Sequence, residues 1–215
     1  MNIFMKGSIT IYPYLFILEN YTKDLEILLE KKIKEFKEMA DKEIENLKNL
    51  TFEEKNHYID SLIDEYHMLK KAYTNFLRTS VFIACFSLLE HELIFLCEQV
   101  QKKKNPKTKF KNFKKRGGII YRTKDYIEKE AKISLSNQKL LWDDLNNYRL
   151  IRNILVHNQG RFDNSKRVKK VEEFVNNKNW LELDKLNRIQ FKKGFLKEVK
   201  KTIEDFSKEL SKALK

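Results

Sequence analysis

The chain has 215 residues, of which 41% are hydrophobic and 35% charged, so it is long enough to bury one sizeable core. With only 5 Gly and 2 Pro, the composition argues against collagen-like chains, Pro-rich chains, β-sandwiches and β-barrels. The formal net charge of +13 favours a polyanionic partner, nucleic acid above all. A merely soluble basic surface is the alternative. We therefore predict an all-α fold in a single domain, residues 1–215.

Two long amphipathic helices are predicted in the first half of the chain. Between 15 and 50, apolar residues recur at spacings of three and four with Lys and Glu between them, a pattern typical of one long helix. Thr51 followed by Glu54 forms a capping box, which predicts that a second helix begins there and continues toward residue 103. We expect a kink near residues 78–80 of this helix.

The apolar stretch Val81–Val100 is long enough to span a membrane, but Glu90, His91 and Glu92 lie at its middle. Ionisable groups at the centre of a bilayer cost several kcal/mol, about 2.5–3.5 each. This stretch is therefore predicted to be a core helix, and no membrane contact is expected. The run Ile9–Leu18 is too short for a span and lacks a cleavage site, so no signal peptide is expected.

The two cysteines, Cys85 and Cys97, lie twelve residues apart in this helical pattern. A rise of about 18 Å separates them, which a disulfide cannot bridge. We predict two buried thiols in a reducing cytosol, and hence a cytoplasmic protein.

Residues 101–118 are predicted to form a basic loop. Asn105-Pro106 and Gly117-Gly118 interrupt the helical pattern, and nine Lys or Arg occur without an acid, interleaved with Phe110 and Phe113. Such a loop is suited to follow an RNA backbone and to stack bases, although a disordered, solvated loop is the alternative. The candidate RNA-binding residues here are Lys109, Lys111, Lys114, Lys115 and Arg116.

The second half is predicted to continue with helices. A short helix is expected at 123–132 and a strong one from 136 to just before Gly160, a residue that fits a C-terminal stop. Residues 161–191 form an irregular insert with a small hairpin or an ordered loop, and a final amphipathic helix runs over 192–214.

The most informative segment is Leu145–Phe162, LNNYRLIRNILVHNQGRF. At 100° per residue, the apolar side of the predicted helix that contains this segment comprises Leu140, Tyr148, Leu150, Ile151, Ile154 and Leu155, and the opposite arc comprises Trp142, Asn146, Arg149, Arg152, Asn153 and His157. This polar arc has no Lys and is rich in groups that bind phosphate and transfer protons.

In this context the chain resembles the HEPN superfamily, whose motif is an Arg, four to six residues and a His, commonly with Asn after the Arg. The matching residues are Arg152-Asn153-Ile154-Leu155-Val156-His157. The segment around Glu90 looks like the central HEPN helix with its acidic position. The long helices, the basic loop and the C-terminal helix look most like the Abi-F-like, abortive-infection branch. The resemblance implies a HEPN-like bundle with long antiparallel helices.

The resemblance also implies a metal-independent endoribonuclease in which two subunits pair their motif helices. Cleavage of RNA by its own 2′-OH needs a group that takes the hydroxyl proton, a group that protonates the leaving 5′ oxygen, and cations that stabilise the phosphorane. One chain offers one well-placed His, whereas a homodimer offers two. The expected products carry 2′,3′-cyclic phosphate and 5′-OH ends, and no cofactor is needed.

The expected roles follow from this chemistry. His157 is the acid and base, Arg152 clamps the phosphate, Asn153 orients it, and Glu90 accepts from Arg152. Arg149 is expected to contact RNA. For Glu90 the alternative is a simple buried partner of a cation.

Structural alternatives remain for the other candidates. For Arg152 and His157 the alternative is an interhelical salt bridge or a helix cap, and for Arg149 it is an ion pair with Asp143 or Asp144.

No metal site is expected, because His91-Glu92-Leu93-Ile94-Phe95 has Phe where the zinc motif H-E-x-x-H needs its second His. The resemblance places the protein in phage defence or as the toxin of a toxin-antitoxin system. Gln159 stands where nucleotidylated HEPN toxins carry Tyr, so an antitoxin RNA or a protein antitoxin is the expected inhibitor. The alternatives are a non-catalytic RNA-binding or scaffold protein with a HEPN fold, and a helical protein-interaction module.

Overall fold

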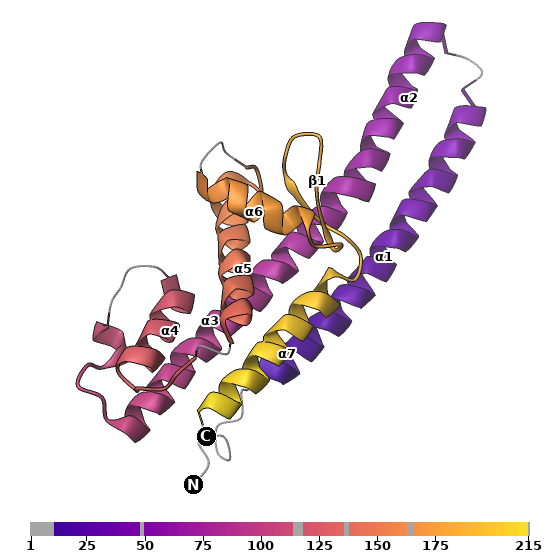
Figure 1. The fold of residues 1–215 in the computed structure, drawn as a ribbon. Coiled ribbons are helices and arrows are strands. Elements are labelled where there is room, and N and C mark those ends of the chain that lie inside the picture. The colour runs from indigo at the N-terminus through magenta and orange to yellow at the C-terminus, as the bar shows by residue number, and fades with distance from the viewer. Residues whose placement is uncertain (1–10, 48–49, 114–117, 136–137, 163–165, 215) are drawn as a thin grey trace. The chain divides into compact units, whose positions relative to one another are not determined.

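The protein is seen here as a computed structural model that describes residues 11–47, 50–113, 118–135, 138–162 and 166–214. Helices dominate these residues, and a single antiparallel pair of short strands is the only sheet they contain, so the predicted all-α fold is confirmed. Figure 1 shows the elements in chain order, which are α1 (Ile11–Glu45), α2 (Phe52–His67), η1 (Met68–Tyr73), α3 (Thr74–Lys104), η2 (Phe110–Asn112), α4 (Gly118–Lys129), α5 (Lys139–Asn158), α6 (Lys166–Asn176), β1 (Leu181–Leu183), β2 (Ile189–Phe191) and α7 (Phe195–Ala213).

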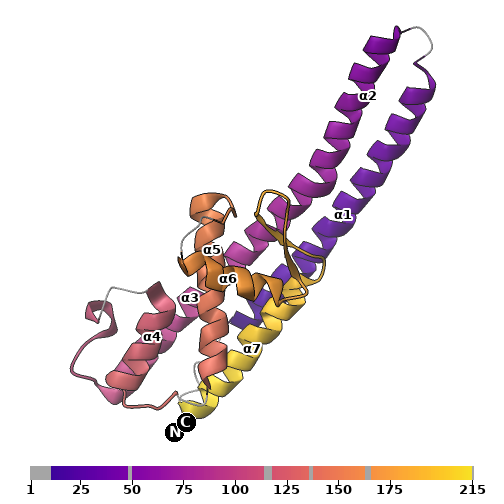
Figure 2. The same ribbon diagram turned by 45° about the horizontal axis from the view of Figure 1, so that its top comes forward.

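The chain divides into two compact units, one of residues 18–81 and one of residues 1–17 with 82–215. In the first unit α1 and α2 run antiparallel and side by side (Figures 1 and 2). The predicted capping box is confirmed, because the Thr51 hydroxyl accepts from the Glu54 amide at 3.3 Å and the Glu54 carboxylate accepts from the Thr51 amide at 2.8 Å. A mostly buried ion pair of Arg78 with Glu26, 2.6 Å long, ties the start of α3 to α1.

The long second helix is continuous but not regular. The predicted kink near residues 78–80 is wrong, since this stretch is ordinary α-helix and the irregular turn is the π-helix η1 at Met68–Tyr73. A π turn holds one residue more than an α-helical turn and does not require a Pro or a Gly. The sequence of η1 favours an ordinary helix, so the π turn could not be predicted from it.

The second unit is built around α5, which packs against α4, α6 and α7. Its Tyr148 is fully buried and meets the rings of Phe82, Phe174 and Trp180 edge to face, with centroids 5.8, 6.0 and 5.9 Å away. The Tyr148 hydroxyl donates to the Thr202 hydroxyl of α7 at 3.1 Å. These contacts fix the orientation of α5 and therefore of every side chain that it presents.

The elements around α5 differ in part from the expected ones. The predicted small hairpin is confirmed, with β1 pairing antiparallel to β2 and Leu181 opposite Phe191. Helix α4 begins at Gly118, five residues earlier than predicted, and α6 was not predicted within the insert. Helix α6 buries Val171 and Val175 at a helical spacing, but the many Lys, Arg and Glu around them weaken that pattern in the sequence.

The cysteines are free and buried, as predicted, and burial raises the pKa of both the Cys85 and the Cys97 thiol to about 12. Both thiols are therefore protonated at neutral pH. Among the described helices, the continuous run Phe52–Lys104 is long and apolar enough to cross a membrane by length and composition. The apolar 18-residue stretch within this run is 44% buried inside the protein. The core helices of soluble proteins are often as long and as apolar as this.

Candidate functional site

The last three turns of α5 carry Arg149, Asn153 and His157 at intervals of four residues, which places them along one stripe of the helix. The helix stops where Gln159 and then Gly160 adopt positive φ angles of 52° and 81°. The Gln159 and Gly160 amides both donate to the Ile154 carbonyl, the latter at 3.0 Å, and so these left-handed residues close the helix end. His157 therefore lies in the last turn, where its imidazole is exposed to solvent.

Each of the two arginines of α5 is paired with an asparagine of the same helix. Arg152 donates from Nη1 to the side-chain oxygen of Asn153 at 3.1 Å, and Arg149 donates from Nε and Nη2 to that of Asn146 at 3.1 and 3.0 Å. Arg152 Nε is buried and has no hydrogen-bond partner among the described residues. A guanidinium has five N–H groups, so both side chains keep donors for a further anion.

Glu90 reaches this region from α3. It is half-buried, and burial raises the pKa of its carboxyl group, while the guanidinium groups of Arg152 and Arg149 act in the opposite direction. No direct ion pair joins Glu90 to either arginine in the described part of the chain. Glu90 thus attracts both guanidinium groups electrostatically, without a direct ion pair.

Helix α4 shapes the position of Arg149. The Arg149 guanidinium lies over the Tyr121 ring, 5.4 Å from its centroid, and a Cβ atom at Gly118 would lie only 3.1 Å from Arg149 Cδ. Asp144 pairs instead with Lys178 at 3.4 Å. Among the described residues Arg149 forms no ion pair with Asp143 or Asp144 and bonds to Asn146 instead, so the ion-pair alternative for Arg149 is wrong.

The predicted two-sided division of α5 needs correction. Leu140, expected on the apolar side, is 82% exposed, whereas Trp142, expected on the polar arc, is 3% exposed and meets the Phe206 ring edge to face. Asn146 is also buried. The reason is that α4, α6 and α7 cover α5 on several sides. The helical periodicity of the sequence therefore does not divide α5 into one exposed face and one buried face.

The basic loop differs from both predicted forms over residues 105–113. Phe110 and Phe113 are 3% and 7% exposed and meet the Tyr126 ring edge to face, with centroids 5.1 and 5.3 Å away. The Phe110 amide also donates to the Gln101 side-chain oxygen at 2.8 Å. These rings belong to the core, so the expectation that they stack bases is wrong, and they anchor a stretch in which Asn105, Lys107, Lys109 and Lys111 are exposed.

Two of the five predicted RNA-binding residues of the loop, Lys109 and Lys111, are exposed at the η2 turn. The other three, Lys114, Lys115 and Arg116, lie outside the described residues.

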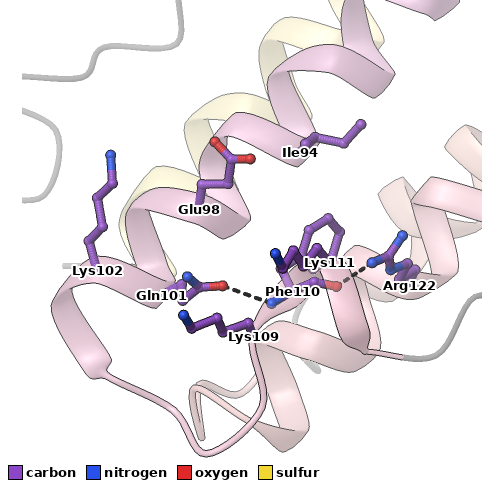
Figure 3. A pocket seen from close by; sticks show the side chains of 8 residues that line it. All are labelled: Ile94, Glu98, Gln101, Lys102, Lys109, Phe110, Lys111 and Arg122. Atoms are coloured by element: carbon purple, nitrogen blue, oxygen red, sulfur yellow. Dashed lines mark hydrogen bonds between the residues drawn. The ribbon is translucent and has the colours of Figure 1, made fainter.

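Next to η2 lies a pocket of 440 Å³ between the end of α3, the η2 turn and the start of α4 (Figure 3). It is lined by the four cations Lys102, Lys109, Lys111 and Arg122 and by the single acid Glu98. The sequence could have indicated this pocket only through the common spacing of Ile94, Glu98 and Lys102, because Arg122 joins it from a separate helix.

Within the described ranges, no group of three or more His, Cys, Asp or Glu residues could hold a metal ion. Comparisons of the chain with family models, with curated proteins and with solved structures find no match.

Proposed function

We propose that this protein is a metal-independent endoribonuclease of the HEPN type, which cleaves RNA to 2′,3′-cyclic phosphate and 5′-OH ends. The observation that carries the proposal is the composition of one end of α5. Two guanidinium groups, each oriented by an asparagine, lie on the same helix as an exposed imidazole and near a half-buried carboxyl group.

The chemistry assigns a task to each of these groups. Arg152 and Arg149 hold the scissile phosphate and stabilise the charge that develops on its oxygens, and Asn153 fixes the Arg152 guanidinium. His157 takes the 2′-OH proton or returns one to the leaving 5′ oxygen. Glu90 attracts both guanidinium groups.

A homodimer completes the site. Proton removal and proton delivery occur on opposite sides of the phosphorus, and one chain offers one His in this region. Two α5 helices facing across a two-fold axis supply two imidazoles and two sets of guanidinium groups to one phosphate. DNA lacks the attacking hydroxyl and stays intact.

The motif resemblance further supports a role in phage defence by abortive infection, or as the toxin of a toxin-antitoxin system in the cytoplasm. The inhibitor in that setting is an antitoxin RNA or a protein antitoxin.

The proposal is tested with purified protein and end-labelled RNA in EDTA, with DNA of the same sequence as control. Cleavage of RNA alone, with cyclic phosphate at the new 3′ ends, supports it. Tight RNA binding without cleavage would identify a non-catalytic RNA-binding or scaffold protein instead, and absence of RNA affinity at physiological salt would identify a protein-interaction module.

A further inference from the structure

The pocket of Figure 3 has the charge and size of a site for one nucleotide. Its volume of 440 Å³ lies in the range of small-molecule sites, about 300–1,000 Å³. Four cations surround one carboxylate, so the preferred ligand is an anion. Lys102, Lys109 and Lys111 are exposed, which leaves their ammonium groups free to meet a phosphate.

The remaining lining residues further restrict the class of ligand that would fit the pocket. Glu98 disfavours a ligand that is negative throughout, but it accepts hydrogen bonds from a ribose hydroxyl or a base N–H. Gln101 uses its side-chain oxygen to accept from the Phe110 amide, which leaves its NH₂ group available as a donor to a ligand. Ile94 adds an apolar wall. A nucleotide combines the three features that these residues would bind, namely a phosphate, N–H and O–H donors, and a flat base with apolar faces.

A ring contact and a hydrogen bond hold one wall of this pocket in place. The Arg122 guanidinium lies 4.3 Å from the centroid of the Phe110 ring and donates from Nη2 to the Phe110 carbonyl oxygen. These contacts join the η2 turn to α4, and Figure 3 shows the hydrogen bond between Phe110 and Arg122 as a dashed line. Lys109 and Lys111 are therefore held at the rim of the pocket by the backbone of η2, so binding costs little ordering of the loop.

The pocket and the α5 site share two elements. Glu90, Ile94, Glu98 and Lys102 are four residues apart along α3, so one helix face leads from Glu90 to the pocket, and Glu98 lies about 12 Å beyond Glu90 at about 1.5 Å per residue. On α4, Tyr121 lies under Arg149 and the next residue, Arg122, lies over Phe110. A strand with about 3.4 Å between stacked nucleotides covers this distance in roughly four nucleotides.

We propose that this pocket seats one nucleotide of the single-stranded RNA substrate, several nucleotides from the phosphate held by Arg152. The inference rests on the proposed function and adds to it a substrate class, namely unpaired RNA long enough to occupy both places. It also makes Glu98, Lys102, Lys109 and Lys111 determinants of substrate affinity.

The test compares a 3-nucleotide RNA, too short to reach the pocket, with a 12-nucleotide RNA. The variant Lys109→Glu with Lys111→Glu is matched by Lys197→Glu with Lys201→Glu, which makes the same charge change at exposed positions of α7. Binding is measured on the His157→Ala background, and KM and kcat on the otherwise native chain.

We expect the pocket variant to bind the 12-mer at least about tenfold more weakly, with KM raised and kcat unchanged, and to treat the 3-mer as the native chain does. Equal losses for both RNA lengths, an equal loss in the control variant, or no loss would overturn the inference. So would uridine monophosphate binding as tightly as the 12-mer, which would identify a mononucleotide site.

The two proposals fail separately. Native protein that cleaves no RNA but shows the length-dependent loss of binding refutes the nuclease and supports the pocket as an RNA contact. Protein that cleaves RNA while the pocket variant behaves like its control refutes the pocket alone.

Discussion

The polar side chains of the site are oriented mostly by their own helix. The pairs Arg152 with Asn153 and Arg149 with Asn146 lie within α5, whereas Glu90 acts from α3 without a direct bond. The residue types and the place of His157 near the helix end were predictable from the sequence. The Arg149 pairing and the contact with Tyr121 were not, because they depend on rotamers and on where α4 begins.

Glu90→Gln tests the balance between burial and attraction at this site. Because burial raises the pKa of Glu90 in the folded state, the folded protein binds this proton more tightly, and the stability that it contributes is present at low pH and lost as pH rises through the folded pKa. The variant should therefore have a slightly higher Tm than the native chain at pH 7. The difference should vanish below about pH 4, the ordinary range of a glutamate.

Thermal unfolding from pH 3.5 to 8 measures this effect. A lower Tm of the variant at pH 7 would mean that attraction to the two arginines outweighs burial. If Glu90 positions Arg152, the variant should also lose RNA cleavage although it is no less stable.

Gly118→Ala tests whether α4 sets the position of Arg149. Gly118 has a φ of 75°, and the added Cβ would press on Arg149 Cδ, so we expect a loss of roughly 1 kcal/mol together with weaker RNA binding. Gly194→Ala is the matched control, since Gly194 has a φ of 85° but open space around it. Denaturant unfolding and RNA titration of both variants check this, and equal RNA affinities would argue against a role for the Arg149 position.

At the scale of elements, the amphipathic helices and the hairpin were predictable, because each has a clear periodicity and clear ends. The π turn η1, the helix α6 and the folded part of the basic loop were not. In the loop, nine basic residues obscured two phenylalanines whose burial depends on Tyr126 of a later helix. Runs of charged residues thus obscured the apolar pattern of elements that are stabilised by tertiary packing.

Phe110→Ala tests that the loop is a packed element. The ring is buried against Tyr126 and under the Arg122 guanidinium, so its loss should reduce the free energy of unfolding by about 3 kcal/mol. Phe52→Ala, at a position 78% exposed, should change it by less than about 0.5 kcal/mol. Chemical denaturation compares the two variants, and a stable Phe110→Ala protein with reduced RNA affinity would instead favour a base-stacking role.

At the scale of the whole molecule, the positive charge is not spread evenly. Acidic residues outnumber basic ones between 18 and 81, so the surplus of +13 comes entirely from the unit that carries α5 and the pocket. The prediction of a polyanionic partner therefore applies to that unit. A homodimer cannot be predicted from periodicity, because a two-fold axis leaves no pattern in a single sequence.

Mixing native and His157→Ala chains tests the homodimer. If each site needs an imidazole from both subunits, activity should fall as the square of the native fraction after the subunits have exchanged. A linear fall would show that each chain acts alone. The rate of RNA cleavage at constant total protein measures this dependence.

The most direct measurement is RNA cleavage in EDTA by the native chain, by His157→Ala and by His57→Ala, which removes an exposed histidine of α2. The account predicts cyclic phosphate ends from the native chain and from His57→Ala, and at least about a hundredfold slower cleavage by a fully folded His157→Ala protein. Cleavage by His157→Ala at the native rate, or RNA left intact by the native chain, would contradict it.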